Sequence, residues 1–178
     1  GSQGDNNGAG GYALLNGLAG AQTFDACVFE FDIQPLGDTI RFDFVFGSEE
    51  YPEFVNSGFN DAFGFFITGQ NPVGPNYANT NIALIPGTTT PVTIDNVNDL
   101  VNNAYYFNNA GGATVQYDGF TQGLTAVAPV VPCQTYQLIL SIADAGDGVY
   151  DSGVFIEQIT SNAVTVDATT SGGVVNAI

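Results

Sequence analysis

Acidic and amide side chains gather in one short segment of this sequence, between two runs of apolar residues. Glu49 and Glu50 directly follow an alternating run that is typical of a strand, and Asn60 and Asp61 directly precede the next apolar run. If the two strands pair, these side chains meet at one end of a sheet. Unpaired like charges would repel each other there, and a bound cation would remove that cost. The alternative interpretation is that they are ordinary acids of a solvated loop.

Three more carboxylates, those of Asp144, Asp147 and Asp151, follow a later strand-like run, with glycines between them. Glycine permits the sharp turns that direct several side chains toward one ion. The spacing differs from that of the EF-hand loop, in which acids fall at alternate positions. The segment therefore predicts part of a calcium site, although an Asp-Gly hairpin turn explains the same residues.

The charged residues are almost all of one sign, since the chain has 18 Asp and Glu residues, one Arg and no Lys, for a net charge of −17. Nucleic acids and anionic membranes bind through Lys and Arg, so neither is an expected partner. The absence of His excludes Ser-His-Asp triads and His-ligated zinc, and the absence of Lys excludes Schiff-base chemistry. Carboxylate, amide and carbonyl oxygens remain, and these ligands suit Ca²⁺. We therefore expect calcium as the cofactor and no enzymatic activity.

Two further segments hold candidate ligands. Asp118 precedes Gly119, and the pair is either a plain turn or a third place for a metal ligand. Asn109 follows a run of aromatic residues, a mixture that is common in pockets for polar ligands and equally common in loops. The expected ligand-binding residues are Asn109, Asp147 and Tyr150. The expected metal ligands are Glu49, Glu50, Asn60, Asp61, Asp118, Asp144, Asp147 and Asp151.

Hydrophobic periodicity places these residues between short strands. Residues 39–46 alternate, with apolar side chains on one face, which predicts a half-buried antiparallel strand. Further strands are predicted over residues 27–33, 62–68, 81–85, 91–94, 115–117, 123–131, 135–142, 154–159 and 164–166, and a short helix near residues 12–15. This pattern predicts an all-β fold, an antiparallel β-sandwich with long calcium-stabilised loops. Residues 1–160 are expected to form the ligand-binding module, and residues 161–178 a final strand, a linker or the start of a neighbouring module.

The sequence has two cysteines, Cys27 and Cys133, each beside a strand-like run. A disulfide between them would close a loop of about 105 residues and contribute about 4 kcal/mol in the chain-entropy model. The alternative is a pair of small buried thiols.

Five segments closely resemble the signature of the bacterial choice-of-anchor L domain, in the same order and over most of the chain, from about residue 11 to residue 157. The first, FVFGSEEYPEF, is similar to the FVFASEEYPEF-type motif of that family. The segments are residues 44–54, 59–66 (FNDAFGFF), 81–88 (NIALIPGT), 117–121 (YDGFT) and 142–155 (IADAGDGVYDSGVF). Members of the family usually carry further strands upstream, including a segment like DGVVLSTG, which this sequence lacks.

The resemblance implies a module of secreted or surface proteins of bacteria. The sequence also looks like the peptide-binding domains of calcium-dependent bacterial adhesins of the RTX type. That likeness implies a calcium-rich sandwich that grips a short peptide, through its free C-terminal carboxylate. The predicted metal ligands match the signature positions, and the resemblance does not say which of them contact a ligand.

Three functions are compatible with these observations. The first is a calcium-dependent adhesion module, monomeric within a longer chain, that binds a peptide or protein, or else a glycan, on another cell surface. The second is a structural spacer that calcium stiffens. The third is a glycosidase that uses two carboxylates, Glu49 or Glu50 with Asp147. Direct membrane insertion is not expected, because no apolar stretch approaches about 18 residues.

Overall fold

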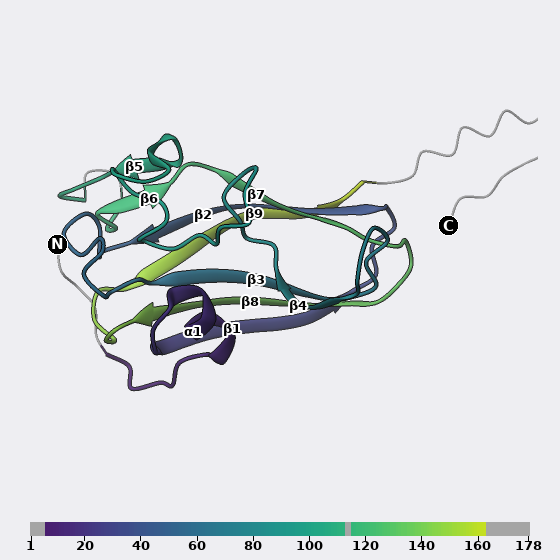
Figure 1. Cartoon of the computed structure of the whole chain (residues 1–178), viewed down its shortest axis with the longest axis horizontal. Coiled ribbons are helices and arrows are strands. Elements are labelled where there is room, and N and C mark those ends of the chain that lie inside the picture. The colour runs from purple at the N-terminus through teal and green to yellow at the C-terminus, as the bar shows by residue number, and fades with distance from the viewer. Residues whose placement is uncertain (1–5, 113–114, 163–178) are drawn as a thin grey trace, which may run out of the picture.

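Two antiparallel sheets pack face to face in the computed structural model, which describes residues 6–112 and 115–162 (Figure 1). The first sheet contains, in spatial order, β1 (Thr23–Ile33), β8 (Tyr136–Ala145), β3 (Ala62–Gly69) and β4 (Tyr77–Asn81). The second sheet contains β9 (Ser152–Ser161), β2 (Thr39–Ser48), β7 (Leu124–Pro129), β6 (Gly119–Thr121) and β5 (Tyr106–Asn108). The predicted all-β sandwich is confirmed.

Strand β2 is the centre of the second sheet. It pairs with β9 along one edge, and with β7 and then β6 along the other. Its alternate apolar side chains point into the sandwich, as the sequence predicts, and all are buried: Ile40, Phe42, Phe44 and Phe46.

Aromatic rings join the two sheets at the centre of the core. The ring centroids of Phe42 on β2 and Phe65 on β3 lie 4.2 Å apart. Those of Phe44 and Phe63 lie 5.0 Å apart on the same two strands. These contacts fix β2 across from β3, and they bury large apolar surfaces that supply most of the driving force for folding.

One helix, α1 (Ala13–Ala19), covers the outer face of the first sheet (Figure 1). Leu15 of the helix packs into a second, smaller core with Phe66 and Ile139 of the sheet. The helix ends at Gly20, whose φ of 72° is left-handed and whose N–H donates to the Asn16 carbonyl oxygen at 3.0 Å.

Three predicted strands are absent where they were expected within the described residues. The predicted strands at 81–85 and 91–94 reduce to isolated bridges, between Leu84 and Pro91 and between Ala62 of β3 and Thr93, and β4 (Tyr77–Asn81) lies earlier instead. The predicted strand at 115–117 is a bend, because the Asn109 side-chain amide holds the carbonyl oxygens of Val115 and Tyr117 at 3.1 and 2.7 Å. The strand predicted at 164–166 lies outside the described residues.

The two cysteines are free thiols, and both are exposed, so the predicted disulfide and its alternative of buried thiols are both wrong. Cys27 lies opposite Ile142 of β8, whereas Cys133 precedes Tyr136, where β8 begins. Six residues of strand, from 136 to 142, separate these places by ~20 Å. A disulfide requires Cα atoms within ~7 Å.

Truncation of the central aromatic contact tests this account of the core. Phe65→Ala should lower the free energy of unfolding by about 3–5 kcal/mol, because it leaves a cavity between β2 and β3. Urea denaturation followed by circular dichroism measures the change. The matched control is Leu100→Ala at an exposed position, which should alter stability by less than ~0.5 kcal/mol. Equal losses for both variants would contradict the assignment of the core.

Candidate functional site

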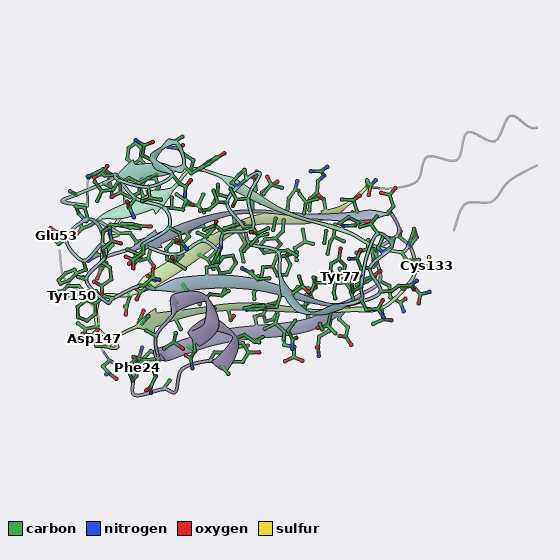
Figure 2. All side chains as sticks on the ribbon, viewed as in Figure 1. Phe24, Glu53, Tyr77, Cys133, Asp147 and Tyr150 are labelled. Atoms are coloured by element: carbon green, nitrogen blue, oxygen red, sulfur yellow. The ribbon has the colours of Figure 1, made fainter. Side chains whose placement is uncertain are left out.

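Four strand ends meet at one end of the sandwich: the ends of β2 and β8 and the beginnings of β3 and β9. In the pairing of β2 with β9, Ser48 lies opposite Ser152, and in that of β3 with β8, Ala62 lies opposite Ala143. The two acidic segments of the sequence therefore come together. The prediction that the strands before Glu49 and after Asp61 pair with each other is wrong, because β2 and β3 belong to different sheets and face each other across the core. Figure 2 labels Asp147 and Tyr150 at this end, opposite the end that carries Cys133.

Asp61 is fully buried at the centre of this junction. Its Oδ1 accepts the N–H of Ala145 at 2.8 Å, and its Oδ2 accepts the hydroxyl of Ser152 at 2.6 Å. The Ser48 hydroxyl makes a longer contact of 3.5 Å with the same oxygen. Burial raises the pKa of Asp61, the charge of Asp147 adds to this rise and these hydrogen bonds oppose it, so that the pKa lies at about 7.

Glu50 is 1% exposed and lies near the same junction. Its backbone N–H donates to the Ser48 hydroxyl at 2.9 Å, but its buried Oε2 has no hydrogen-bond partner. Burial is the main reason that the pKa of Glu50 rises to about 8. The negative charges of Asp61, Asp147 and Asp144 also contribute to this rise. Such an unpartnered buried oxygen is costly unless a proton or a cation reaches it.

Asp144 lines a cavity of about 220 Å³ beside the junction. Asp25 and Asp151 line the same cavity. Burial, followed by the charges of Asp61, Asp151 and Asp25, raises the pKa of Asp144 to about 8. One small polar cavity therefore brings together carboxylates from three strands or their ends.

Asp25 is a site residue that the sequence analysis missed. It lies in β1 at an irregularity of the pairing with β8, and its φ of 47° is left-handed. Its carboxylate accepts the N–H groups of Asn7 and Ala9 at 2.8 and 2.7 Å, which fixes the incoming chain beside the cavity. The available signal was a polar residue that breaks the apolar alternation of β1.

A tyrosine ring closes one side of this cavity, and two glycines make room for it. Gly47 of β2 and Gly153 of β9 lie opposite each other. A Cβ atom would lie 3.0 Å from the Tyr117 ring at Gly47 and 2.2 Å from the Tyr117 hydroxyl at Gly153. Burial is the main cause that raises the pKa of Tyr117, and the charges of Asp151, Glu49 and Asp144 contribute as well. The buried Glu49 thus acts on the Tyr117 side of the site.

The side chain of one predicted metal ligand, Asn60, is engaged elsewhere, and the charge of another, Asp118, acts on Tyr106. The Asn60 amide donates to the Ala19 carbonyl oxygen at 2.9 Å and accepts the Asp95 N–H at 2.9 Å, so it ties α1 to a loop. Asp118 lies near Tyr106, whose pKa is raised to about 12 by burial, then by Asp99, Glu53 and Asp118.

The predicted ligand-contact residues have two different roles in the structure. Asn109 stabilises its own loop, whereas Tyr150 and Asp147 lie at the rim of the site. Buried Asn109 uses its amide N–H groups to hold its own loop. Tyr150 lies at the rim, where its ring centroid is 5.4 Å from that of Phe54, and Phe54 meets Phe59 edge-on at 5.5 Å. Asp147 is near Tyr150 in Figure 2, and its Oδ1 accepts the Val149 N–H at 3.1 Å.

The donor set suits a hard cation only in part. Carboxylates and hydroxyls are the oxygen ligands that Ca²⁺ prefers, and the Oε2 of Glu50 is unpartnered. However, within residues 6–112 and 115–162 no three His, Cys, Asp or Glu side chains are arranged so that they could hold an ion together. Coordination would therefore require rotation of side chains, or ligands from the backbone and water. Arg41 cannot neutralise the site, because it lies near the start of β2, opposite Val127 and Thr160.

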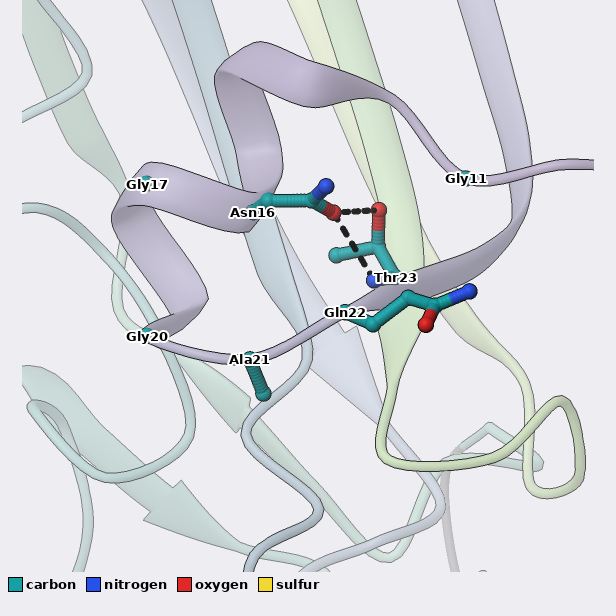
Figure 3. A pocket seen from close by; sticks show the side chains of 7 residues that line it. All are labelled: Gly11, Asn16, Gly17, Gly20, Ala21, Gln22 and Thr23. Carbon is teal, nitrogen blue, oxygen red and sulfur yellow. Dashed lines mark hydrogen bonds between the residues drawn. The ribbon is translucent and has the colours of Figure 1, made fainter.

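A larger hollow of about 620 Å³ lies beside α1, with no acid among its lining residues (Figure 3). Asn16 and Thr23 line it, and the Asn16 Oδ1 accepts the N–H and the hydroxyl of Thr23 at 2.8 and 2.7 Å. The other lining residues are Gly11, Gly17, Gly20, Ala21 and Gln22. None of these lining residues is ionisable, so the hollow offers no acid or base.

Comparison with known proteins finds one family. The family model described as the Choice-of-anchor L domain matches residues 1–162. No curated protein and no solved structure matches the chain. Choice-of-anchor domains occur in bacterial surface-anchored proteins, which identifies the chain as a surface-associated extracellular module. Among the described residues, no helix is long and apolar enough to cross a bilayer. The likeness to RTX-type adhesins stays a prediction.

The raised pKa values predict a stability that falls as pH rises. In the unfolded chain, Asp and Glu titrate near pH 4. In the folded chain, Glu50, Asp61 and Asp144 titrate at about 8, 7 and 8. The folded state therefore holds more protons in this window, and the free energy of unfolding decreases with pH. In EDTA, the melting midpoint should fall by at least ~5 °C between pH 5.5 and 8.5.

Differential scanning fluorimetry at constant ionic strength measures this dependence. Exposed acids are already ionised at pH 5.5, so they contribute little to the slope. A midpoint that is constant or that rises over this range would contradict the burial of these carboxylates in the folded state.

Proposed function

Because this chain belongs to the choice-of-anchor L domain family, we propose that it is a calcium-dependent ligand-binding module of a bacterial surface adhesin. It grips a short peptide or a protein C-terminus at the acidic end of the sandwich. The observation that carries this proposal is the burial of Glu50, Asp61 and Asp144 at one junction, where Glu50 has an unpartnered oxygen.

The buried carboxylates need a counter-charge, which a calcium ion would supply. Carboxylates buried together repel each other and lose their hydration, and both costs are large without a counter-charge. The sequence has no Lys or His to supply that charge. A divalent cation with oxygen ligands could supply it, and rotation of the side chains of Glu50, Asp144 and the cavity residue Asp25 would let them take part in holding it. Bound calcium would add positive charge at the end of the sandwich.

Bound calcium would also allow the acidic end to bind the carboxylate of a peptide. A peptide ends in a carboxylate, which a surface of net charge −17 repels unless a bound cation offsets that charge. The rim beside the acids carries the ring of Tyr150 packed on Phe54, and such rings offer apolar surface to a side chain of the peptide. Asp147, next to this rim, is the expected polar contact.

A calcium titration tests the proposal. A thermal melt in excess EDTA is compared with melts in 10 mM CaCl₂, in 10 mM MgCl₂ and in NaCl of matched ionic strength. For a site that binds with a Kd of about 0.1 mM, calcium adds about 2.7 kcal/mol, which raises the midpoint by several degrees. The NaCl sample separates this effect from general screening of the negative surface.

A peptide screen in calcium and in EDTA completes the test. Peptides with a free C-terminal carboxylate should bind in calcium and lose binding when amidated, and a glycan array run beside them covers a carbohydrate ligand. A calcium shift with no peptide or glycan binding would favour a spacer that calcium stiffens. No calcium shift would overturn the proposal.

The variant Glu50→Gln tests whether a cation or only a proton neutralises the buried carboxylate of Glu50. Gln removes the buried charge but keeps the shape of the side chain. In EDTA at pH 8.5 the variant should melt about 3 °C or more above the parent, whereas it should lose part of the calcium shift. Glu53→Gln, an exposed acid of the same loop, is the control and should change neither value. A full calcium shift in Glu50→Gln would remove Glu50 from the site.

A further inference from the structure

In the described part of the chain, the second sheet has no strand opposite β1. Strand β2 lies across from β3, as their ring contacts show. Strand β9, the neighbour of β2, lies across from β8, because Val154 and Ile156 share a cavity with Leu140 and Ile142. The first sheet continues from β8 to β1, whereas among the described residues nothing follows β9. The sandwich is therefore open along one side, between β1 and β9.

Apolar side chains that point into the sandwich are exposed along this opening. Phe29 lies opposite Leu140, a core residue, and yet it is 63% exposed. On β9, Ile156 and Ile159 lie opposite Phe44 and Phe42 of the core, and they are 43% and 42% exposed. We call Phe29, Ile156 and Ile159, with the adjoining Cys27, the open seam. A cavity of about 190 Å³ with an almost wholly apolar wall lies along it.

The seam also presents a free strand edge. Strand β9 pairs with β2 along one edge, and within residues 6–112 and 115–162 no strand pairs with the other. Such an edge offers unpaired N–H and C=O groups to an added strand. The geometry points to a single extended peptide strand, supplied from outside residues 1–178, that pairs with the free edge of β9. Its alternate side chains would cover Phe29 and fill the seam.

A second copy of the chain does not fit this edge. In a symmetric dimer joined through β9, the β9 strand of each copy would lie across from β1 of the other. The strand β8 of each copy already lies across from its own β9, so β1 of one copy and β8 of the other would need the same space. Two copies would also bring together two net charges of −17.

The sequence that follows β9 does not supply this apolar cover either. A strand that turned back along β9 through two to four residues would place residues 166–168 opposite Ile159 and residues 169–171 opposite Ile156. Only Val166 in these two stretches has a large apolar side chain, so nothing in them would cover Ile156 and Phe29.

The chemistry of the added strand follows from its surroundings. It needs aliphatic residues at alternate positions, because one side faces Phe29 and the isoleucines. The other side faces solvent beside Glu157 of β9, on a chain of net charge −17. Lys at those positions is therefore favoured over Glu.

A synthetic strand tests this inference on the full 178-residue chain. The probe is a fluorescein-labelled peptide KVTIKVTV with an amidated C-terminus, and fluorescence anisotropy measures binding. A scrambled peptide, KVVTTIVK, should bind at least about tenfold more weakly, because its apolar residues no longer alternate. The acidic peptide EVTIEVTV should also bind more weakly.

The protein variants locate the site. Phe29→Ser should weaken binding of KVTIKVTV about tenfold and leave the melting midpoint within a few degrees, since Phe29 is exposed. Leu100→Ser, at another exposed apolar position, should leave binding unchanged. Glu50→Gln should also leave it unchanged, and the amidated probe has no carboxylate, so failure here is distinct from failure of the calcium proposal.

Three outcomes would overturn the inference. The first is equal binding of the alternating and scrambled peptides, or no binding of either. The second is equal weakening by Phe29→Ser and Leu100→Ser. The third is slow hydrogen exchange, in the chain without peptide, at the β9 amides that face away from β2, because such protection would mean that the edge is already paired.

Discussion

The buried carboxylate of Asp61 is the constraint on which the acidic end of this protein depends. Its oxygens accept hydrogen bonds from the backbone N–H of Ala145 in β8 and from the hydroxyl of Ser152, where β9 begins. Asp61 itself directly precedes β3. Strand ends that are distant in the sequence are thereby held at one junction. The same arrangement brings Glu50 and Asp144 close enough for their charges to interact. Removing the carboxylate would leave these donors unsatisfied in the interior.

The composition of the chain decides how this junction is neutralised. In most proteins a buried acid finds Lys, Arg or His, and here the only basic side chain, Arg41, lies far along β2. Two agents remain, a proton and a cation from solution. They respond to conditions in opposite ways, because protonation fades as pH rises whereas deprotonated carboxylates bind cations more tightly. If the proposed cation binds, pH and divalent cation together would set the state of the acidic end.

The elements with clear periodicity were predictable, and the site was predictable only in outline. Alternation identified β2 with its inward face, and apolar runs identified β3 and β8. Strand β4, with the sequence YANTN, has no apolar alternation, so sequence reasoning missed it. The gathering of Glu50 and Asp61 at one end of the sandwich followed from their places at strand ends, although the flanking strands β2 and β3 face each other across the core instead of pairing. Which oxygens are already engaged did not, because Asn60 and Asn109 bond to backbone groups that only the fold brings near.

The acidic end and the open seam obey different physics, and this separates two kinds of contact on one module. Ligand contacts proposed at the acidic end would depend on charge, so they would vary with calcium, pH and salt. Contacts proposed at the seam would depend on backbone hydrogen bonds and on the burial of Phe29 and its neighbours, which salt affects little.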